Sequence, residues 1–413
     1  MFGISSIILY LLLFVAVYVQ IFFLITFIER RKETYRRQGK LNLKKYFSTT
    51  IIVACWNEEK TISGTIKSLL NLSYPKDKLK IFIVDDGSTD HTWKIMKKFE
   101  KYFQVKIFQK ENGGKHTALN LALDYVDTEL VGCLDADSFV DQYALERITS
   151  YFEDQETMAV SPSIIIHKPK GLIQITQEIE YYMAVFIKKM LGLIGGIYVT
   201  PGPFSIYRKK VFDTLGKFRP AYNTEDMEIA FRMQSNHYKI NQCHDAYVYT
   251  VAPHSVRGLY KQRLRWIYGF LNNTIDYRKI LFNPKYGNLS VFSIPAGVFS
   301  IIAFLYVFAM LVYNFLNFMI NKLIQVNTVG VNLNFENLNY DLFFINTQST
   351  ALLIILTYFL IITSIVIGTR MYKGRFSVSV RIIYFIITYS LIAPFWLLRA
   401  VYNTIVKKQP SWR

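Results

Sequence analysis

The sequence is poor in residues that build disulfide scaffolds and metal clusters. It has three cysteines among 413 residues, namely Cys55, Cys133 and Cys243. They are far apart and form no C-x-x-C pair, so neither a disulfide framework nor a zinc site is indicated, and reduced cytosolic thiols are expected. The six histidines do not cluster at metal-ligand spacing, and none is assigned to catalysis.

Acidic residues are also scarce relative to basic ones. The chain has 30 Asp and Glu against 48 Lys and Arg, and its formal net charge is +18. Such an excess suits a protein that meets nucleic acid, anionic lipid or an anionic substrate. Because 52% of the residues are hydrophobic and 16% are aromatic, the chain is more apolar than a typical soluble protein. Lipid is therefore favoured over nucleic acid as the partner of the charge.

Long hydrophobic runs are missing from the middle of the chain, and the first one lies at its start. Residues 7–28 are long enough to cross a bilayer at a rise of about 1.5 Å per residue, and too long for a signal-peptide core. Residues 1–28 are therefore predicted to form a retained transmembrane helix. The following residues 29–48 hold eight Lys or Arg and two Glu, which predicts a basic cytoplasmic linker against anionic head groups.

Three further hydrophobic runs cover Val291–Phe315, Thr350–Gly368 and Ile382–Leu398. Residues 291–413 are thus predicted to hold about three spans. The nearly uncharged link 321–349 is expected outside the membrane, and the basic link 369–381 inside. The same count puts the basic C-terminal tail outside, against the positive-inside rule. Either the last segment is re-entrant or interfacial, or the number of spans is off by one.

Strand-like and helix-like segments alternate between these runs. This pattern predicts an α/β domain with a mainly parallel sheet over residues 49–255. An amphipathic interface region, 256–285, follows it. Polar residues follow three of the strands, at Asn57-Glu58, Asp85-Asp86 and Asp135-Ala136-Asp137. Ligands of such sheets bind beyond the carboxyl ends of the strands. A dinucleotide fold is disfavoured because no G-x-G-x-x-G follows the first strand.

The pair Asp135 and Asp137 ends a buried strand, where an unpaired carboxylate is costly. Two carboxylates at this spacing suit Mg²⁺ or Mn²⁺, which complete their coordination with substrate phosphate oxygens. The plainer alternative is an Asx turn that caps the next helix.

Two more motifs indicate a nucleotide-linked substrate. In VDDGSTD, Asp85 and Asp86 could accept hydrogen bonds from a uracil ring or a ribose. In ENGGKHTALN, two glycines and Lys115 precede a helix, whose N–H groups favour phosphate. An N-cap turn and an ordinary loop are the respective alternatives.

Together these motifs resemble those of family 2 glycosyltransferases. The segments ACWNEE, VDDGSTD, NGGKHTALN, LDADS, NTEDMEIAFRM and QRLRW occur in the family's order and spacing. The resemblance covers roughly residues 45–285 and is nearest to the processive membrane synthases of cellulose, hyaluronan and poly-β-1,6-N-acetylglucosamine. It implies a GT-A fold and an inverting transfer from a UDP-sugar.

The resemblance also implies roles for the matched residues. Asp226, with Glu225 beside it, is implied to be catalytic, because a poor hydroxyl nucleophile needs a carboxylate to take its proton. Metal binding is implied for Asp135 and Asp137. Substrate or acceptor binding is implied for Asp85, Asp86, Lys115, Asp135, Gln262, Arg265 and Trp266. A helix cap is the alternative role for Asp226, and a membrane-interface anchor that for Trp266.

An amphipathic helix is predicted over residues 171–190. Its apolar face would comprise Leu172, Ile175, Ile179, Met183, Phe186 and Met190. It would lie near the membrane mouth or pack against the catalytic domain. The loop 199–212 resembles the family's acceptor-side loop, although Pro201 stands where many relatives have a small polar residue.

The favoured hypothesis is a processive, multi-pass glycosyltransferase of the plasma membrane with a cytoplasmic catalytic domain. It would extend a β-linked polysaccharide from UDP-N-acetylglucosamine and translocate it. Expected partners are the UDP-sugar, a polysaccharide or lipid-linked acceptor, membrane lipid and an accessory membrane or export subunit, but no nucleic acid. The alternatives are single-sugar transfer to a lipid or short acceptor, and an inactive membrane scaffold.

Overall fold

The computed structural model describes residues 4–37, 39–329 and 349–410. The chain divides into two compact units, one formed by residues 1–25 and 296–363 and the other by residues 26–295 and 364–413. The second unit holds all the motifs singled out above.

An eight-stranded mixed sheet is the base of the second unit, with strand order β3-β2-β1-β4-β7-β6-β8-β5. The first four strands in this order are β3 (Val105–Lys110), β2 (Leu79–Asp86), β1 (Thr49–Cys55) and β4 (Leu130–Asp135), and they run parallel. The others are β7 (Ser205–Arg208), β6 (Thr157–Ile166), β8 (Lys239–Thr250) and β5 (Ser138–Val140). β7 runs antiparallel to both its neighbours, and β5 to β8. The predicted α/β class with a mainly parallel sheet is confirmed.

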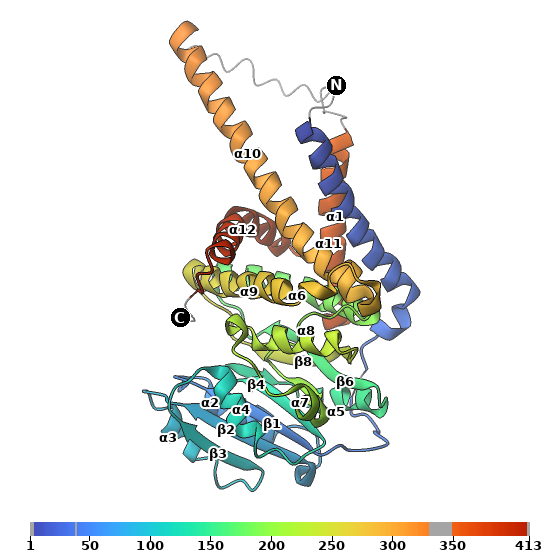
Figure 1. The fold of residues 1–413 in the computed structure, drawn as a ribbon, viewed down its shortest axis with the longest axis vertical. Helices are drawn as coiled ribbons and strands as arrows, with labels where there is room; N and C mark the ends of the chain where they lie inside the picture. The colour runs from blue at the N-terminus through green and yellow to red at the C-terminus, as the bar shows by residue number, and fades with distance from the viewer. Residues whose placement is uncertain (1–3, 38, 330–348, 411–413) are drawn as a thin grey trace. The chain divides into compact units, whose positions relative to one another are not determined.

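Helices cover the sheet and bury its central strands (Figure 1). They are α2 (Ile62–Leu70), α3 (Thr92–Lys97), α4 (Lys115–Leu123), α5 (Ala144–Thr149), α6 (Gly171–Leu193), α7 (Lys209–Leu215) and α8 (Glu225–Ser235). A further helix, α9 (Val256–Asp276), packs on α8. Residues Ile51, Ile52 and Val53 of β1 have no exposed surface, so successive side chains on both faces are buried. This burial explains why the strand is continuously apolar.

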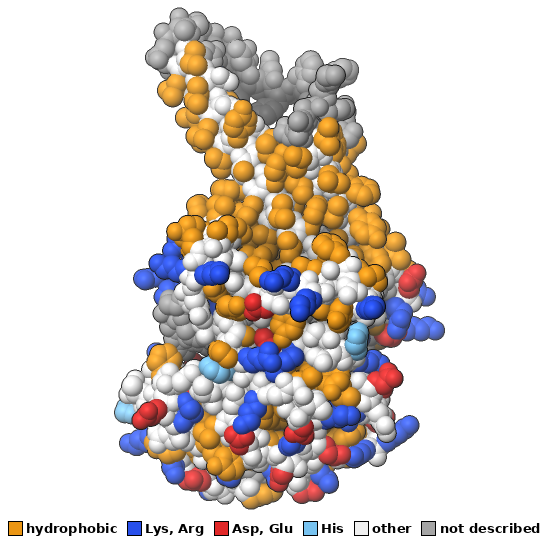
Figure 2. Space-filling view, viewed as in Figure 1, with side chains coloured by type: hydrophobic (Ala, Val, Ile, Leu, Met, Phe, Trp, Pro, Cys, Tyr) orange, Lys and Arg blue, Asp and Glu red, His pale blue; other side chains and the backbone are white. Residues whose placement is uncertain are grey.

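The described residues include four helices long and apolar enough to cross a membrane. They are α1 (Ile4–Glu29), α10 (Ile294–Val329), α11 (Ser349–Lys373) and α12 (Arg381–Ile405). Figure 2 shows apolar side chains exposed along α10, and Leu311, Phe315 and Leu323 are each at least 60% exposed. Such a surface suits a lipid environment. Most of the link expected outside the membrane, residues 330–348, lies beyond the described part of the chain.

The last of these helices, α12, packs along α6 and α9 of its own unit (Figure 1). Near its start Arg381 donates to Glu178 at 2.9 Å, and near its middle the Tyr389 hydroxyl donates to Glu180 at 2.6 Å. Near its end Thr404 accepts a hydrogen bond from Asn272 at 3.2 Å. These polar contacts along the whole helix favour the interfacial interpretation of the last hydrophobic run.

The predicted amphipathic helix is α6, but its buried face differs from the expected one. Leu172 is 51% exposed, whereas Ile179 and Phe186 are buried as predicted. The buried surface also includes Gln174 and Gln177, whose amides donate to the Ala252 and Pro253 carbonyls at 2.7 and 2.8 Å. These polar contacts replace part of the expected apolar stripe because α6 packs against β6 and β8 of the domain. Hydrophobic periodicity alone could not show them.

Candidate active site

Three parallel strands bring their polar ends to one edge of the sheet. β1 lies between β2 and β4, with Cys55 opposite Asp85 and Ala54 opposite Asp135. The residues that follow β1, Asn57 and Glu58, therefore lie at the same edge as the acids of β2 and β4. This is the edge at which parallel α/β sheets bind their ligands.

Asp85 and Asp86 order the loops beside them. Asp86 accepts hydrogen bonds from the backbone N–H groups of Gly113 and Gly114, at 3.1 and 2.9 Å. It also forms an ion pair with Lys110 at 2.7 Å. Asp85 accepts from the Ser88 N–H and from the Gln109 amide, both at 3.2 Å. These carboxylates hold the glycine loop before α4, and their contact with UDP stays a prediction.

Lys115, the first residue of α4, joins two other parts of the candidate site. Its Nζ lies 2.7 Å from Asp135 Oδ1, at the end of β4, and 3.0 Å from Glu225 Oε1, at the start of α8. Although burial opposes it, the surrounding carboxylates hold the pKa of Lys115 well above its usual value. Burial acts to raise the pKa of Glu225, but the charge and hydrogen bond of Lys115 bring it below its usual value. Both groups are therefore charged at neutral pH.

Gly202 lies directly against this ion pair. A Cβ atom on Gly202 would be 2.6 Å from Lys115 Nζ and 2.9 Å from Asp135 Oδ1, closer than real contacts allow. The Gly202 N–H donates to Asp226 Oδ2 at 3.2 Å. A side chain at this position would therefore have to displace the Lys115 ammonium or the Asp135 carboxylate. Sequence reasoning missed this residue, although the flanking prolines of Pro201-Gly202-Pro203 signalled a constrained loop.

Asp226 lies in the first turn of α8, where its backbone is fixed. Its carbonyl accepts hydrogen bonds from the Thr200 N–H at 3.1 Å and from the Thr200 hydroxyl at 2.9 Å. Burial and the neighbouring Glu225 raise the pKa of Asp226 to about 6, while Lys115 acts in the opposite direction. A carboxylate with a pKa of about 6 is about nine-tenths ionised at pH 7 and more basic than an ordinary aspartate.

Asp137 lies beside Asp135 and repels it. Burial, then the charges of Asp135 and Glu58, raise the pKa of Asp137 to about 7. The Ser138 hydroxyl donates to Asp137 at 3.1 Å. Among the described residues, no group of three or more His, Cys, Asp and Glu is arranged to hold a metal by itself. Two mutually repelling carboxylates do fit a divalent cation that takes its remaining ligands from a diphosphate.

The helix that carries the Q-x-x-R-W motif, α9, packs tightly against the residue before Glu225. A Cβ atom on Gly269 would lie 2.4 Å from the Thr224 side chain, so the glycine permits this approach. The Asn273 amide donates to the Thr224 hydroxyl at 3.1 Å. The charge of Arg265 also contributes to the lowered pKa of Glu225. The acids of α8 and the motif of α9 thus form one packed assembly.

Trp266 of this motif is stacked on a buried arginine that sequence reasoning did not select. The guanidinium of Arg263 lies 4.2 Å from the centre of the Trp266 ring. Arg263 also pairs with Glu180 of α6 and donates to Gln262 Oε1 at 3.0 Å. The Arg263 guanidinium therefore covers one face of the indole. Residues of three helices hold this cation, because Glu180 of α6 also accepts a hydrogen bond from Tyr389 of α12.

Two further residues of α6 were missed, Tyr181 and Lys188. Burial lowers the pKa of Lys188 to about 8, while Asp226 and Glu180 act in the opposite direction. Burial raises the pKa of Tyr181 to about 12, with Arg263 opposing and Asp137 adding to the rise. Within the described chain, no carboxylate oxygen lies within 4.0 Å of Lys188 Nζ. Their seven-residue spacing on one helix face was the signal that could have found them.

Comparisons with known proteins show which sequences this chain resembles. Residues 50–216 match the family described as Glycosyl transferase family 2. Over 223 residues the chain is 31% identical to the poly-beta-1,6-N-acetyl-D-glucosamine synthase of Staphylococcus epidermidis, which covers 53% of this chain and 54% of the relative. Over 266 residues it is 29% identical to the same synthase of Staphylococcus aureus strain COL. This match covers 62% of this chain and 64% of the relative. The chain thus spans between half and two thirds of the length of these relatives.

A solved structure is similar over nearly the whole chain. It is the mannosyltransferase PcManGT from Pyrobaculum calidifontis, in complex with GDP-Man and Mn²⁺. The TM-score is 0.60, with 96% of this chain and 99% of the other covered, and the sequence identity is 16%. This likeness supports the GT-A-like fold with its flanking helices. Residues 50–216 thus match glycosyl transferase family 2, and the chain resembles the poly-beta-1,6-N-acetyl-D-glucosamine synthases over about half of its length.

Proposed function

We propose that this protein transfers a sugar from a UDP-sugar to the end of a growing β-linked polysaccharide at the cytoplasmic face of the plasma membrane. The observation that carries the proposal is the position of Asp226. Its carboxylate is held by the Gly202 N–H at 3.2 Å, beside the ion pair of Lys115 and Asp135. A buried base next to a cation and a strand-end acid suits transfer from a diphosphate donor.

In this mechanism Asp226 takes the proton of the acceptor hydroxyl. The hydroxyl oxygen forms a bond to the anomeric carbon while the bond to the diphosphate breaks on the opposite side, so the configuration is inverted. The Gly202 N–H donates to one oxygen of the Asp226 carboxylate, and the other oxygen can accept the proton. The raised pKa of Asp226, about 6, strengthens this base without protonating it at pH 7.

A divalent cation, Mg²⁺ or Mn²⁺, would be held by Asp135 and Asp137. When bound, it would neutralise charge on the leaving diphosphate. Burial, and then repulsion by Asp135, raise the pKa of Asp137 to about 7, and a bound cation would offset that repulsion. Asp135 can exchange its partner Lys115 for the metal, which would free the Lys115 ammonium to bind phosphate.

UDP-N-acetylglucosamine is the favoured donor, because the staphylococcal relatives are named as synthases of an N-acetylglucosamine polymer. We also propose that the chain is processive, spans the membrane several times and translocates its product with the aid of an accessory subunit, as the resemblance to processive synthases implies.

The deciding experiment incubates membranes containing this protein with each labelled UDP-sugar and sizes the product. Long polymer from UDP-N-acetylglucosamine supports the whole proposal. A product with one added sugar on a lipid or short acceptor supports glycosyl transfer but contradicts processivity. Absence of both UDP release and product with every sugar would support the scaffold alternative.

A further inference from the structure

A cavity lies away from the acids of the candidate active site. Its volume is about 280 Å³, and it is lined by the linker after α1, the C-terminal end of α6 and strand β8. The lining side chains that matter for its chemistry are those of Lys32, Glu33, Arg37, Lys189 and His244. None of them belongs to the catalytic or metal-binding residues proposed above.

Lys189 places a buried cation in this cavity. The residue is 4% exposed, and burial lowers its pKa, although Cys243 and Glu33 act in the opposite direction. In the described part of the chain, no carboxylate oxygen lies within 4.0 Å of Lys189 Nζ, so Lys189 forms no ion pair there. A buried ammonium without a paired anion is costly, so this position favours an external anion.

His244 adds a buried imidazole to this cavity. It is 2% exposed, and neither ring nitrogen has a hydrogen-bond partner of normal geometry among the described residues. Burial and the nearby Lys189 lower the pKa of His244 to about 4, against Asp245 and the Thr34 backbone. The imidazole is therefore neutral at pH 7 and has one N–H to donate. Buried polar atoms without partners are rare and call for a ligand or water.

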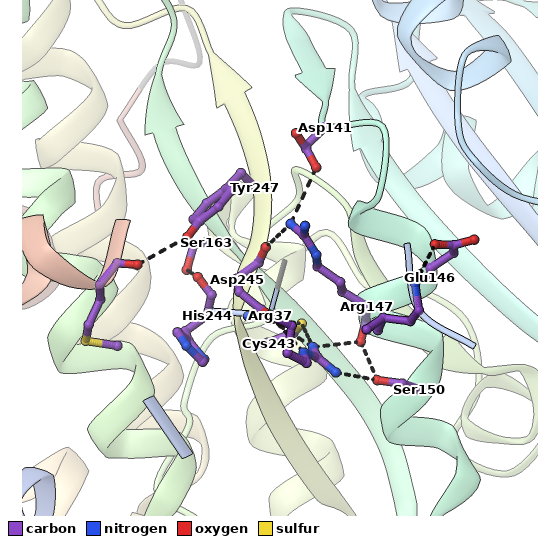
Figure 3. A network of polar contacts seen from close by, with 12 residues as sticks. Arg37, Asp141, Glu146, Arg147, Ser150, Ser163, Cys243, His244, Asp245 and Tyr247 are labelled. Carbon is purple, nitrogen blue, oxygen red and sulfur yellow. Dashed lines mark hydrogen bonds and ion pairs between the residues drawn. The ribbon is translucent and has the colours of Figure 1, made fainter. Parts of the chain in front are cut away.

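Arg37 fixes one wall of the cavity. Its Nε lies 2.8 Å from Asp245 Oδ2, and its Nη1 lies 2.9 Å from Ser150 Oγ (Figure 3). The linker is thus tied to β8, and the charge of Arg37 does not lie against lipid as expected from the sequence. The one acidic residue among the described lining residues, Glu33, is paired with Arg30. With Arg37 and Glu33 both compensated, Lys32 and Lys189 leave the cavity positively charged.

We propose that this cavity binds a phosphate ester anion between Lys189, Lys32 and the His244 N–H. The anion could be the head group of an anionic membrane lipid or a soluble phosphate compound. The linker that supplies Lys32 begins directly after Glu29, the last residue of the candidate membrane helix α1, which favours the lipid. This inference does not depend on the proposed transferase function.

The test is native mass spectrometry of the full-length protein in neutral detergent. The probes are dihexanoyl phosphatidylglycerol, the zwitterionic dihexanoyl phosphatidylcholine and inorganic phosphate. We expect the anionic lipid to bind wild-type protein more tightly than the zwitterionic one. Lys189→Met removes the buried charge and should weaken this binding about tenfold or more, because hydrogen bonds to charged partners are the strong ones.

Two further variants keep the test interpretable. Lys32→Gln alters an exposed side chain of the same cavity, so it should weaken binding without disturbing the fold. Lys67→Met removes an exposed lysine on α2 and should leave binding unchanged. Competition by inorganic phosphate would support a site for phosphate in general, and its absence a site for lipid head groups. Equal affinities in all four proteins, or no preference for an anionic probe, would overturn the proposal.

Discussion

At the scale of single residues, the candidate site depends on how charges are balanced around Lys115. This one cation pairs with both Asp135 and Glu225. It also lowers the pKa of Asp226, which burial and Glu225 raise. Changing any of these groups should therefore alter the protonation of the others, and the direction of each change follows from its charge.

Asp226→Asn tests the proposed base directly. The amide keeps the shape of the side chain but cannot take a proton, so transfer should fall by roughly 10²–10⁴-fold, the usual contribution of a positioned base. Affinity for the UDP-sugar, measured by calorimetry, should stay close to that of the wild type. Near-normal turnover of labelled UDP-sugar would remove Asp226 from the mechanism.

The pH dependence of transfer should reveal the same carboxylate. Since the pKa of Asp226 is raised to about 6, kcat/KM should fall as the pH drops through about 6 and the base becomes protonated. Lys115→Met removes the cation that lowers this pKa, so the acidic limb should move to higher pH. Glu225→Gln removes a charge that raises it, so the limb should move to lower pH.

Lys217→Met is the control for these profiles, because Lys217 pairs with Asp124 on the exposed surface. It should leave the limb in place. If Lys115→Met and Glu225→Gln shift the limb in the same direction, or if neither shifts it, the acidic limb does not report Asp226.

The metal dependence of UDP-sugar binding should arise from Asp135 and Asp137, the two acids at the end of β4. Asp137→Asn should reduce the affinity for the UDP-sugar to the value that wild-type protein shows with a chelator, because one of two metal ligands is lost. Asp141→Asn alters an acid whose Oδ1 lies 3.6 Å from Arg147, and it should keep metal-dependent binding. If neither a chelator nor Asp137→Asn changes the affinity for the UDP-sugar, the Asp-x-Asp motif holds no metal and is a simple turn.

At the scale of helices, α6, α9 and α12 meet around Trp266. Arg263 stacks on the indole, Glu180 of α6 pairs with Arg263, and Tyr389 of α12 donates to Glu180 at 2.6 Å. These contacts pack a held cation against one face of the Trp266 ring. Its flat apolar surface is the proposed platform for the terminal sugar of the acceptor.

Trp266→Ala should remove about 1–3 kcal/mol of stacking, if base–aromatic stacking is a fair guide. Polymer synthesis should fall steeply while UDP affinity remains, and Trp266→Phe should keep part of the activity. Glu180→Gln leaves the ring but weakens its support, so an intermediate loss is expected. Trp93→Ala is the matched control, because Trp93 is a similar indole with Lys97 at 5.1 Å, on α3.

Polymer yield and length, together with UDP affinity, are the readouts for these variants. Normal-length polymer from Trp266→Ala would make Trp266 only an interfacial anchor. A loss of UDP binding as large as that of Asp137→Asn would instead make it a support of the nucleotide site.

At the scale of the whole molecule, the course of the chain across the membrane depends on α12. Counting four spans puts the basic tail outside, whereas an interfacial α12 keeps it with the basic links. The contacts of α12 with α6 and α9 favour the second arrangement. With α1, α10 and α11 as the three spans, all basic links and the tail obey the positive-inside rule.

Single cysteines in intact cells test this topology. Because Cys55, Cys133 and Cys243 are buried, they should stay unreactive and give a low background. Lys408→Cys should react with an impermeant maleimide only after the cells are opened. Asn334→Cys, in the link expected outside, should react at once. Labelling of Lys408→Cys in intact cells would show that α12 crosses the membrane.

Much of the fold followed from local pattern. Strand ends at Asp86 and Asp135, the start of α8 at Glu225 and the apolar run of α1 are encoded by contiguous residues, whose periodicity and caps act over one or two turns. The family motifs placed Lys115, Asp226 and Trp266 among the candidates for the same reason, since each lies in a short contiguous segment.

Tertiary structure alone decided what these residues touch. That Lys115 pairs with Glu225, that Gly202 donates to Asp226, and that α12 lies along α9 all join segments far apart in the sequence. The partner of a buried charge depends on which strands and helices become neighbours, and no local periodicity carries that information. Arg37 shows the limit most clearly. By sequence it is one of eight similar basic residues in the linker, and only the folded chain pairs it with Asp245 on β8, because burial there demands a compensating charge.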